Sequence, residues 1–123
     1  MNILIADDEL LIRKTLKKVF EQKGFNVLMC ADGKEAIDQW LGFKPDLVIL
    51  DVIMPNMGGV DVLKYITKNE KFQNSKIIII SAYSAGGTKE EFLKLGATEF
   101  VRKPFENVFN FADHCLSLLG TAQ

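Results

Sequence analysis

The chain has 123 residues, of which 48% are hydrophobic and 25% are charged, and 15 basic residues against 16 acidic ones give a net charge of −1. This length suits one domain with a sizeable core, and the composition is far from that of a disordered chain. The balanced charge argues against a general nucleic-acid or membrane surface, so we expect a single domain over residues 1–123 that binds neither directly.

Five short apolar runs divide the chain. Most of them are apolar on both faces instead of alternating with polar residues, which is typical of central strands in a parallel sheet covered on both sides. We predict strands at 2–6 (NILIA), 26–30 (NVLMC), 46–50 (DLVIL), 76–80 (KIIII) and 98–101 (TEFV).

The segments between these runs carry apolar residues at helical spacing. In the first of them Leu16, Val19 and Phe20 lie on one stripe, and Gly24 stands where a helix would stop. Gly42 and Pro45 are expected to end the second helix. We predict helices over 10–23, around 36–41, around 60–66, over 88–95 and over 106–119.

The alternation of strand and helix predicts an α/β fold. A strict (βα)5 pattern requires parallel strands joined by right-handed helical crossovers. We therefore predict one doubly wound, flavodoxin-like domain with a five-stranded parallel sheet. In the strand order 2-1-3-4-5 the first and third strands are neighbours at the switch point, where ligands bind.

The N-terminus does not resemble a signal peptide, because MNILIADDE meets two aspartates after six residues. No apolar stretch approaches the length of a membrane span. We expect a cytoplasmic protein in which Cys30 and Cys115 are free buried thiols. A disulfide or metal role is the alternative, which their wide separation does not favour.

Polar side chains follow four of the five predicted strands. Asp7 and Asp8 come after the first strand, Asp51 after the third, Ser81 after the fourth, and Lys103 after the fifth. The carboxyl ends of parallel strands share one edge of the sheet, so the three carboxylates should converge there, flanked by the hydroxyl and the ammonium group.

Three adjacent carboxylates raise one another's pKa unless a cation neutralises them. A hard divalent cation with few protein ligands and retained waters fits Mg²⁺ better than Ca²⁺. Asp51 would then have two partners, a metal shared with Asp8 and the ammonium of Lys103. A carboxylate beside a metal, a lysine and a hydroxyl is suited to accept a phosphoryl group.

Four motifs, ADDE, VILDVIMPNMGG, IIIISAYS and FVRKPF, resemble in order and separation the receiver domain of two-component response regulators. The resemblance covers essentially the whole chain. It implies that Asp51 accepts a phosphoryl group from a histidine kinase or phosphotransfer protein, and that Ser81 and Lys103 contact that group. It also implies that Asp8, Asp51 and the backbone carbonyl of Ile53 ligate Mg²⁺, with Asp7 acting mainly through water.

The same resemblance implies a signalling role and no turnover of a separate substrate. Phe100 would be an aromatic switch that changes the surface of the fourth helix, fifth strand and fifth helix, to which a downstream protein or output domain binds. It also implies a cis Lys103–Pro104 bond, and side chains of Ile53 and Tyr83 that face the phosphoryl site. A stand-alone protein and the receiver part of a longer regulator both remain open.

Two other functions share parts of this pattern. A flavodoxin-like FMN module needs a phosphate cradle after the first strand, where this chain has DDELL. A phosphatase of the haloacid dehalogenase type needs an aspartate two residues after its nucleophile, where this chain has Ile53.

Three further residues have competing interpretations. His114 is interpreted as a solvated or capping residue in preference to a phosphodonor. Phe105 and Phe109 either pack in the core or mark a partner surface. The glycine-rich segment SAGGT, 84–88, is expected to be mobile.

Overall fold

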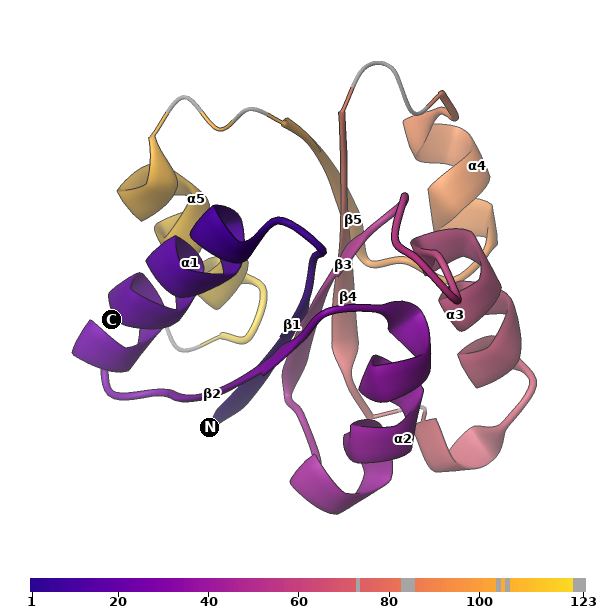
Figure 1. Ribbon diagram of the computed structural model, residues 1–123, viewed down its shortest axis with the longest axis horizontal. Helices are drawn as coiled ribbons and strands as arrows, with labels where there is room; N and C mark the ends of the chain where they lie inside the picture. Colours follow the sequence, from indigo (N-terminus) through magenta and orange to yellow (C-terminus); the bar gives the residue numbers. More distant parts are fainter. Residues whose placement is uncertain (73, 83–85, 104, 106, 121–123) are drawn as a thin grey trace.

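All five predicted strands form one parallel sheet in the order β2-β1-β3-β4-β5 (Figure 1), which confirms the predicted topology. The computed structural model describes residues 1–72, 74–82, 86–103, 105 and 107–120. The strands are β1 Asn2–Ala6, β2 Asn26–Cys30, β3 Leu47–Asp51, β4 Lys76–Ala82 and β5 Glu99–Lys103. The helices are α1 Leu10–Gln22, α2 Gly33–Phe43, α3 Gly59–Thr67, α4 Lys89–Lys94 and α5 Val108–Ser117, with a short 3-10 helix at Glu70–Phe72.

The sheet has a hydrophobic core on each face, which explains why its strands are apolar throughout. Figure 1 shows α1 and α5 on one side of the sheet and α2, α3 and α4 on the other. In β1, Ile3 and Ile5 pack with α1 and α5, whereas Leu4 and Ala6 pack with α2 and α3. Successive strand side chains point to opposite faces, so a continuous apolar run supplies both cores.

The helix ends follow local signals, with one exception. Gly24 ends the first helix region with φ +92°, as predicted. The second helix, α2, ends at Phe43, between Gly42 and Pro45, the two residues expected to end it, and the Phe43 side chain packs against the core. Lys44 then takes the left-handed conformation with φ 55° and its N–H bonds to the Trp40 carbonyl, so a non-glycine residue caps this helix.

Three strands are longer at their carboxyl ends than the apolar runs indicate. Asp51 is the last residue of β3, β4 continues through Ser81, and β5 continues to Lys103. In the parallel ladders Asp51 is level with Ile80, and Ala82 is level with Lys103. Strand hydrogen bonding therefore fixes the backbone direction of the site residues.

Both cysteines are free and buried, as predicted. Burial raises the pKa of the Cys30 thiol to about 12 and also raises the pKa of Cys115. No helix in the described part of the chain combines the length and apolar character needed to cross a membrane.

Candidate functional site

Carboxylates gather at the carboxyl edge of the sheet, where β1 and β3 lie side by side. Asp7, Asp8 and Glu9 follow β1 directly, and Asp51 ends β3. Each of these four residues offers a carboxylate oxygen, and the four oxygens all lie within 4.8 Å of one another. The convergence expected for Asp7, Asp8 and Asp51 is therefore present, and Glu9 joins it.

Lys103 reaches this cluster from β5. Its Nζ donates to Asp51 Oδ2 at 2.9 Å, to Glu9 Oε1 at 2.8 Å and to Asp7 Oδ2 at 3.2 Å, which occupies all three ammonium donors. The residue is only 6% exposed. Burial by itself would lower the pKa of Lys103, but the hydrogen bonds to Glu9 and Asp51 and the charges of Asp7 and Asp51 outweigh it, so the pKa is raised. Lys103 is therefore held as a cation.

Asp7 is the most deeply buried carboxylate of the cluster. Burial, followed by the charge of Asp51, raises its pKa to about 6, although the N–H of Glu9 and the Lys103 ammonium oppose this shift. The Glu9 N–H donates to Asp7 Oδ1 at 2.8 Å. Both oxygens of Asp7 thus have protein partners, and its carboxylate still carries a raised pKa.

The donor set fits a hard divalent cation. Among the described contacts, Lys103 is the cation that pairs with three of the four carboxylates, Asp7, Glu9 and Asp51, so negative charge remains in excess. The raised pKa of Asp7 follows first from its burial, and the neighbouring charge of Asp51 adds to it. Oxygen-only ligands and partial exposure match the way Mg²⁺ binds proteins, with several waters retained.

The two aspartates after β1 differ in availability. Asp7 is fully buried and bonded on both oxygens, whereas the side chain of Asp8 is exposed at the mouth of the cluster. Ile53 lies in the segment that follows β3, and its side chain is 59% exposed. Asp8 therefore has the freer carboxylate for direct coordination.

Glu9 is a site residue that the sequence reasoning missed. Its carboxylate makes the shortest of the three Lys103 contacts, at 2.8 Å, although the side chain is 58% exposed. The signal was present, because Glu9 is the third consecutive acidic residue in ADDE. Because Glu9 lies between β1 and α1 at the carboxyl edge of the sheet, contact with a lysine at the same edge could have been expected.

Ser81 lies on the strand beside Asp51, and the hydrogen bond that its hydroxyl donates goes to the backbone. It follows Ile80, the residue level with Asp51, and it is fully buried. Its Oγ donates to the carbonyl of Ala82 at 3.1 Å. Ser81 is therefore on the strand next to Asp51, and its hydroxyl is hydrogen-bonded to the backbone.

Phe100 is the middle layer of a stack that was not predicted. The rings of Phe92 and Phe100 are parallel to within 11°, with centroids 5.0 Å apart, and the Arg102 guanidinium lies 4.8 Å from the Phe100 centroid. Arg102 also donates to the carbonyls of Ala82, at 3.2 Å, and Gly87, at 2.8 Å. The stack and the two Arg102 hydrogen bonds therefore connect β5 to α4, to the last residue of β4 and to Gly87, which precedes α4.

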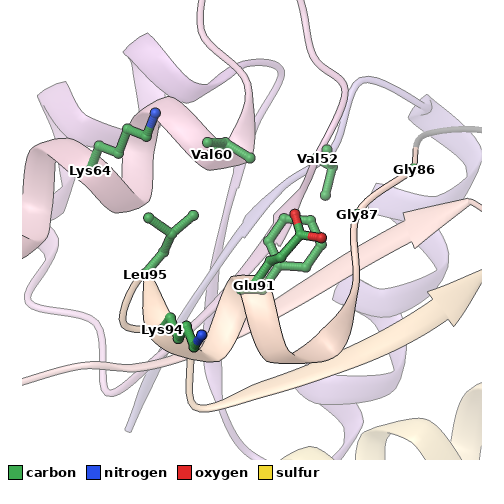
Figure 2. A pocket seen from close by; sticks show the side chains of 9 residues that line it. Val52, Val60, Lys64, Gly86, Gly87, Glu91, Lys94 and Leu95 are labelled. Carbon is green, nitrogen blue, oxygen red and sulfur yellow. The ribbon is translucent and has the colours of Figure 1, made fainter.

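A hollow of about 460 Å³ lies between α3 and α4 and borders this stack (Figure 2). Val52, directly after Asp51, lines it together with Gly87 and Phe92. Lys64 and Lys94 bring positive charge to its lining. The hollow is thus lined both by the residue that follows β3 and by Phe92, one ring of the stack.

Several sequence predictions concern residues at the edge of this region. Phe105 stacks on Phe111 at 4.2 Å, whereas Phe109 is 58% exposed. His114 Nε2 lies 3.3 Å from a carboxylate oxygen of Glu99, which begins β5, whereas Lys103 of the acidic cluster ends it. Tyr83, Pro104 and part of the SAGGT segment lie outside the described residues.

Comparison with known proteins assigns the family. The sequence profile of the response regulator receiver domain matches residues 3–108. The chain is 37% identical over 105 residues to the chemotaxis protein CheY of Thermotoga maritima, covering 85% of this chain and 86% of that protein. It is 36% identical over 108 residues to the response regulator RR06 of Streptococcus pneumoniae, covering 88% of this chain and 48% of that protein.

The fold comparison agrees. A receiver domain of the Francisella response regulator 1452 superposes with a TM-score of 0.86 at 29% sequence identity, covering 99% of this chain and 98% of that one. The sheet order, the acidic cluster and the sequence match all lead to the same assignment. The chain belongs to the response regulator receiver domain family, and its function is that of a phosphoacceptor in two-component signalling.

Proposed function

We propose that Asp51 is the phosphoacceptor and that its donor is a histidine kinase or a histidine phosphotransfer protein. The observation that carries this proposal is the Asp51 carboxylate itself, which ends β3 inside the acidic cluster and is bonded through one oxygen by Lys103. The other oxygen is the nucleophile. It forms the new oxygen–phosphorus bond while the phosphorus–nitrogen bond of the donor histidine breaks and its electron pair remains on the imidazole.

The other residues act on the charge of the transferred group. Lys103, held as a cation, contacts one phosphoryl oxygen, and the Ser81 hydroxyl donates to another after leaving the Ala82 carbonyl. Asp8, Asp51 and the Ile53 carbonyl would hold Mg²⁺, with Asp7 acting mainly through water. When bound there, the ion would supply charge neutralisation for the phosphoryl oxygens. The freer carboxylate of Asp8 supports its assignment as a direct ligand.

Transfer to Asp51 and its later hydrolysis are reactions of the domain on itself, so we propose no separate substrate. Phosphorylation adds about −1.5 to −2 charge and new acceptor oxygens. Drawing the Ser81 hydroxyl inward frees space that Phe100 fills, and the surface of α4, β5 and α5 changes. A downstream protein or an output domain reads that surface. RR06, which is about twice as long as the matched region, supports reading by an output domain of the same chain. The Thermotoga CheY, most of whose length is matched, supports reading by a separate downstream protein.

The competing functions have less support. The turn after β1 presents Asp7, Asp8 and Glu9, whose charges would repel a flavin phosphate. Ile53 occupies the position in which a haloacid dehalogenase phosphatase requires its second aspartate. A flavin site gives no role to the bonded Lys103–Asp51 pair.

The direct test is phosphorylation by a small acyl phosphate, with and without Mg²⁺, followed by intact-mass and peptide analysis. Asp51→Asn preserves size and removes the nucleophile, so we expect no incorporation, whereas the matched Asp38→Asn, on the exposed face of α2, should incorporate phosphate as the wild type does. Wild-type incorporation by Asp51→Asn would refute the assignment.

A further inference from the structure

The segment between β3 and α3, residues 52–58, leads from Asp51 to the next helix and carries Ile53. Its ends are bonded to the sheet and to each other, because the Val52 N–H donates to the Ile80 carbonyl at 3.1 Å and the Gly59 N–H donates to the Val52 carbonyl at 3.0 Å. Between these anchors the chain makes a turn in which Asn56 has φ 66°. Inside the segment the Met57 N–H donates to the Pro55 carbonyl at 2.7 Å, and the turn has further support from another element. We call residues 52–58 the β3–α3 loop.

That support comes from the start of α2. The Asn56 Nδ2 donates to Asp32 Oδ2 at 2.7 Å, and the Gly33 N–H donates to the Met57 carbonyl at 2.9 Å. The two elements approach so closely that a Cβ on Gly33 would lie 2.3 Å from the Met57 oxygen. A side-chain bond and a backbone bond thus join two adjacent loop residues to two adjacent residues of the α2 start.

Asp32 has a second task at the same time. Its Oδ1 accepts the Glu35 N–H at 2.8 Å, so the residue is the N-cap of α2. The Glu35 N–H and then the Asn56 amide hold the pKa of this carboxyl below its usual range, which shows that both bonds favour the charged form. One carboxylate therefore links the loop to a helix that is fixed in the core through Ala36 and Trp40.

We infer that Asp32 is a positioning residue for the metal site: through Asn56 it holds the β3–α3 loop in the conformation that presents the Ile53 carbonyl to Mg²⁺. The inference rests on the proposed function, since it concerns the same site. It extends that function to a residue on another loop, 19 positions before Asp51 in the sequence. Partners that orient a ligating group usually affect metal affinity as well as the ligand's position.

The informative variant separates the two tasks of Asp32. Asp32→Ser retains a good N-cap but has no second oxygen for Asn56. We expect Mg²⁺ affinity, measured by calorimetry, to fall about threefold to tenfold, a smaller loss than for partners bonded directly to a ligand. In metal-free protein the Gly33 amide should exchange hydrogen faster. The control Asp38→Ser, later on α2, should change neither quantity.

Two further variants test the bond from its other side. Asn56→Gly accepts the positive φ and lacks the amide, so it should reproduce the loss in affinity. The double variant Asp32→Asn with Asn56→Asp reverses donor and acceptor. It should recover most of the Mg²⁺ affinity that Asp32→Asn alone or Asn56→Asp alone loses. A merely structural N-cap would not show this recovery.

The possible outcomes distinguish failure of the positioning role of Asp32 from failure of the proposed function. Wild-type Mg²⁺ affinity in Asp32→Ser and Asn56→Gly, with normal phosphorylation of Asp51, would overturn the positioning role alone. A wild-type protein that binds no Mg²⁺ would overturn the metal assignment and this inference together.

Discussion

Lys103 is the residue on which the carboxylates of the site converge. Its ammonium is bonded to Asp7, Glu9 and Asp51, so the proposed contact with a phosphoryl oxygen requires it to give up at least one bond. Glu9 is the most exposed of the three partners and its ion pair is the most screened by water. We therefore expect Lys103 to exchange Glu9 for the phosphoryl group while it keeps its buried contacts.

Asp8→Ala should separate metal binding from folding. Loss of an outer partner already costs about 10–100-fold in metal affinity, so loss of a direct ligand should weaken Mg²⁺ binding by at least about tenfold, as measured by calorimetry. The metal-free variant should melt slightly higher, because one of the crowded carboxylates is gone. Asp61→Ala, which removes an exposed acid on α3, is the control. Equal affinity in Asp8→Ala and wild type would remove Asp8 from the ligand set.

Asp7 makes the stability of the metal-free protein depend on pH. Burial raises the pKa of Asp7 from 3.8 to about 6. The protonated carboxyl therefore stabilises the folded protein fully below the pKa of the unfolded chain, and this stabilisation is lost as the pH rises through about 6. Relative to Asp7→Asn, the wild-type free energy of unfolding should fall by on the order of 2–3 kcal/mol from about pH 4 to about pH 7. Denaturant unfolding of both proteins measures the difference, and parallel pH curves would show that Asp7 is not responsible.

At the scale of elements, the stack of Phe92, Phe100 and Arg102 opposes the proposed movement of Phe100. Phe100 cannot move inward without leaving the parallel ring of Phe92 and the guanidinium above it. Aromatic pairs contribute about 0.5–1.5 kcal/mol beyond the area they bury, and cation–π contacts contribute a similar amount. A complete reversal of the two states requires about 5.5 kcal/mol of differential interaction, so the phosphoryl group must also overcome this stack.

Ser81→Ala should uncouple phosphorylation from that movement. Asp51 and Lys103 are unchanged in this variant, so phosphate uptake continues, but the hydroxyl that would be drawn inward is missing. NMR spectra with and without a phosphoryl mimic should show smaller shifts in α4 and β5 than in wild type. Ser117→Ala on α5 removes a hydroxyl that donates to the nearby His114 carbonyl, and it should leave the shifts intact. Wild-type shifts in Ser81→Ala would exclude Ser81 as the coupling residue.

At the scale of the whole molecule, the sequence predicted what depends on strand ends and periodicity. The sheet order, the two apolar faces and the meeting of Asp7, Asp51 and Lys103 follow from parallel strands sharing one edge. The bond between Asp32 and Asn56 was not predictable in this way, because the residues are 24 positions apart and meet only when α2 packs beside α3. The ring stack depends on side-chain packing between α4 and β5, which periodicity does not specify.

The two faces of the sheet each contain one thiol, Cys30 with α2–α4 and Cys115 with α1 and α5. The alkylation rate of each thiol therefore reports how often the core on its own face of the sheet opens to solvent. Since both halves share the same five strands, we expect the two labelling rates, read separately by peptide mass spectrometry, to coincide and to follow global unfolding. Faster labelling of Cys115 would reveal that the α1–α5 layer detaches on its own, leaving the phosphoacceptor strands covered on one side only.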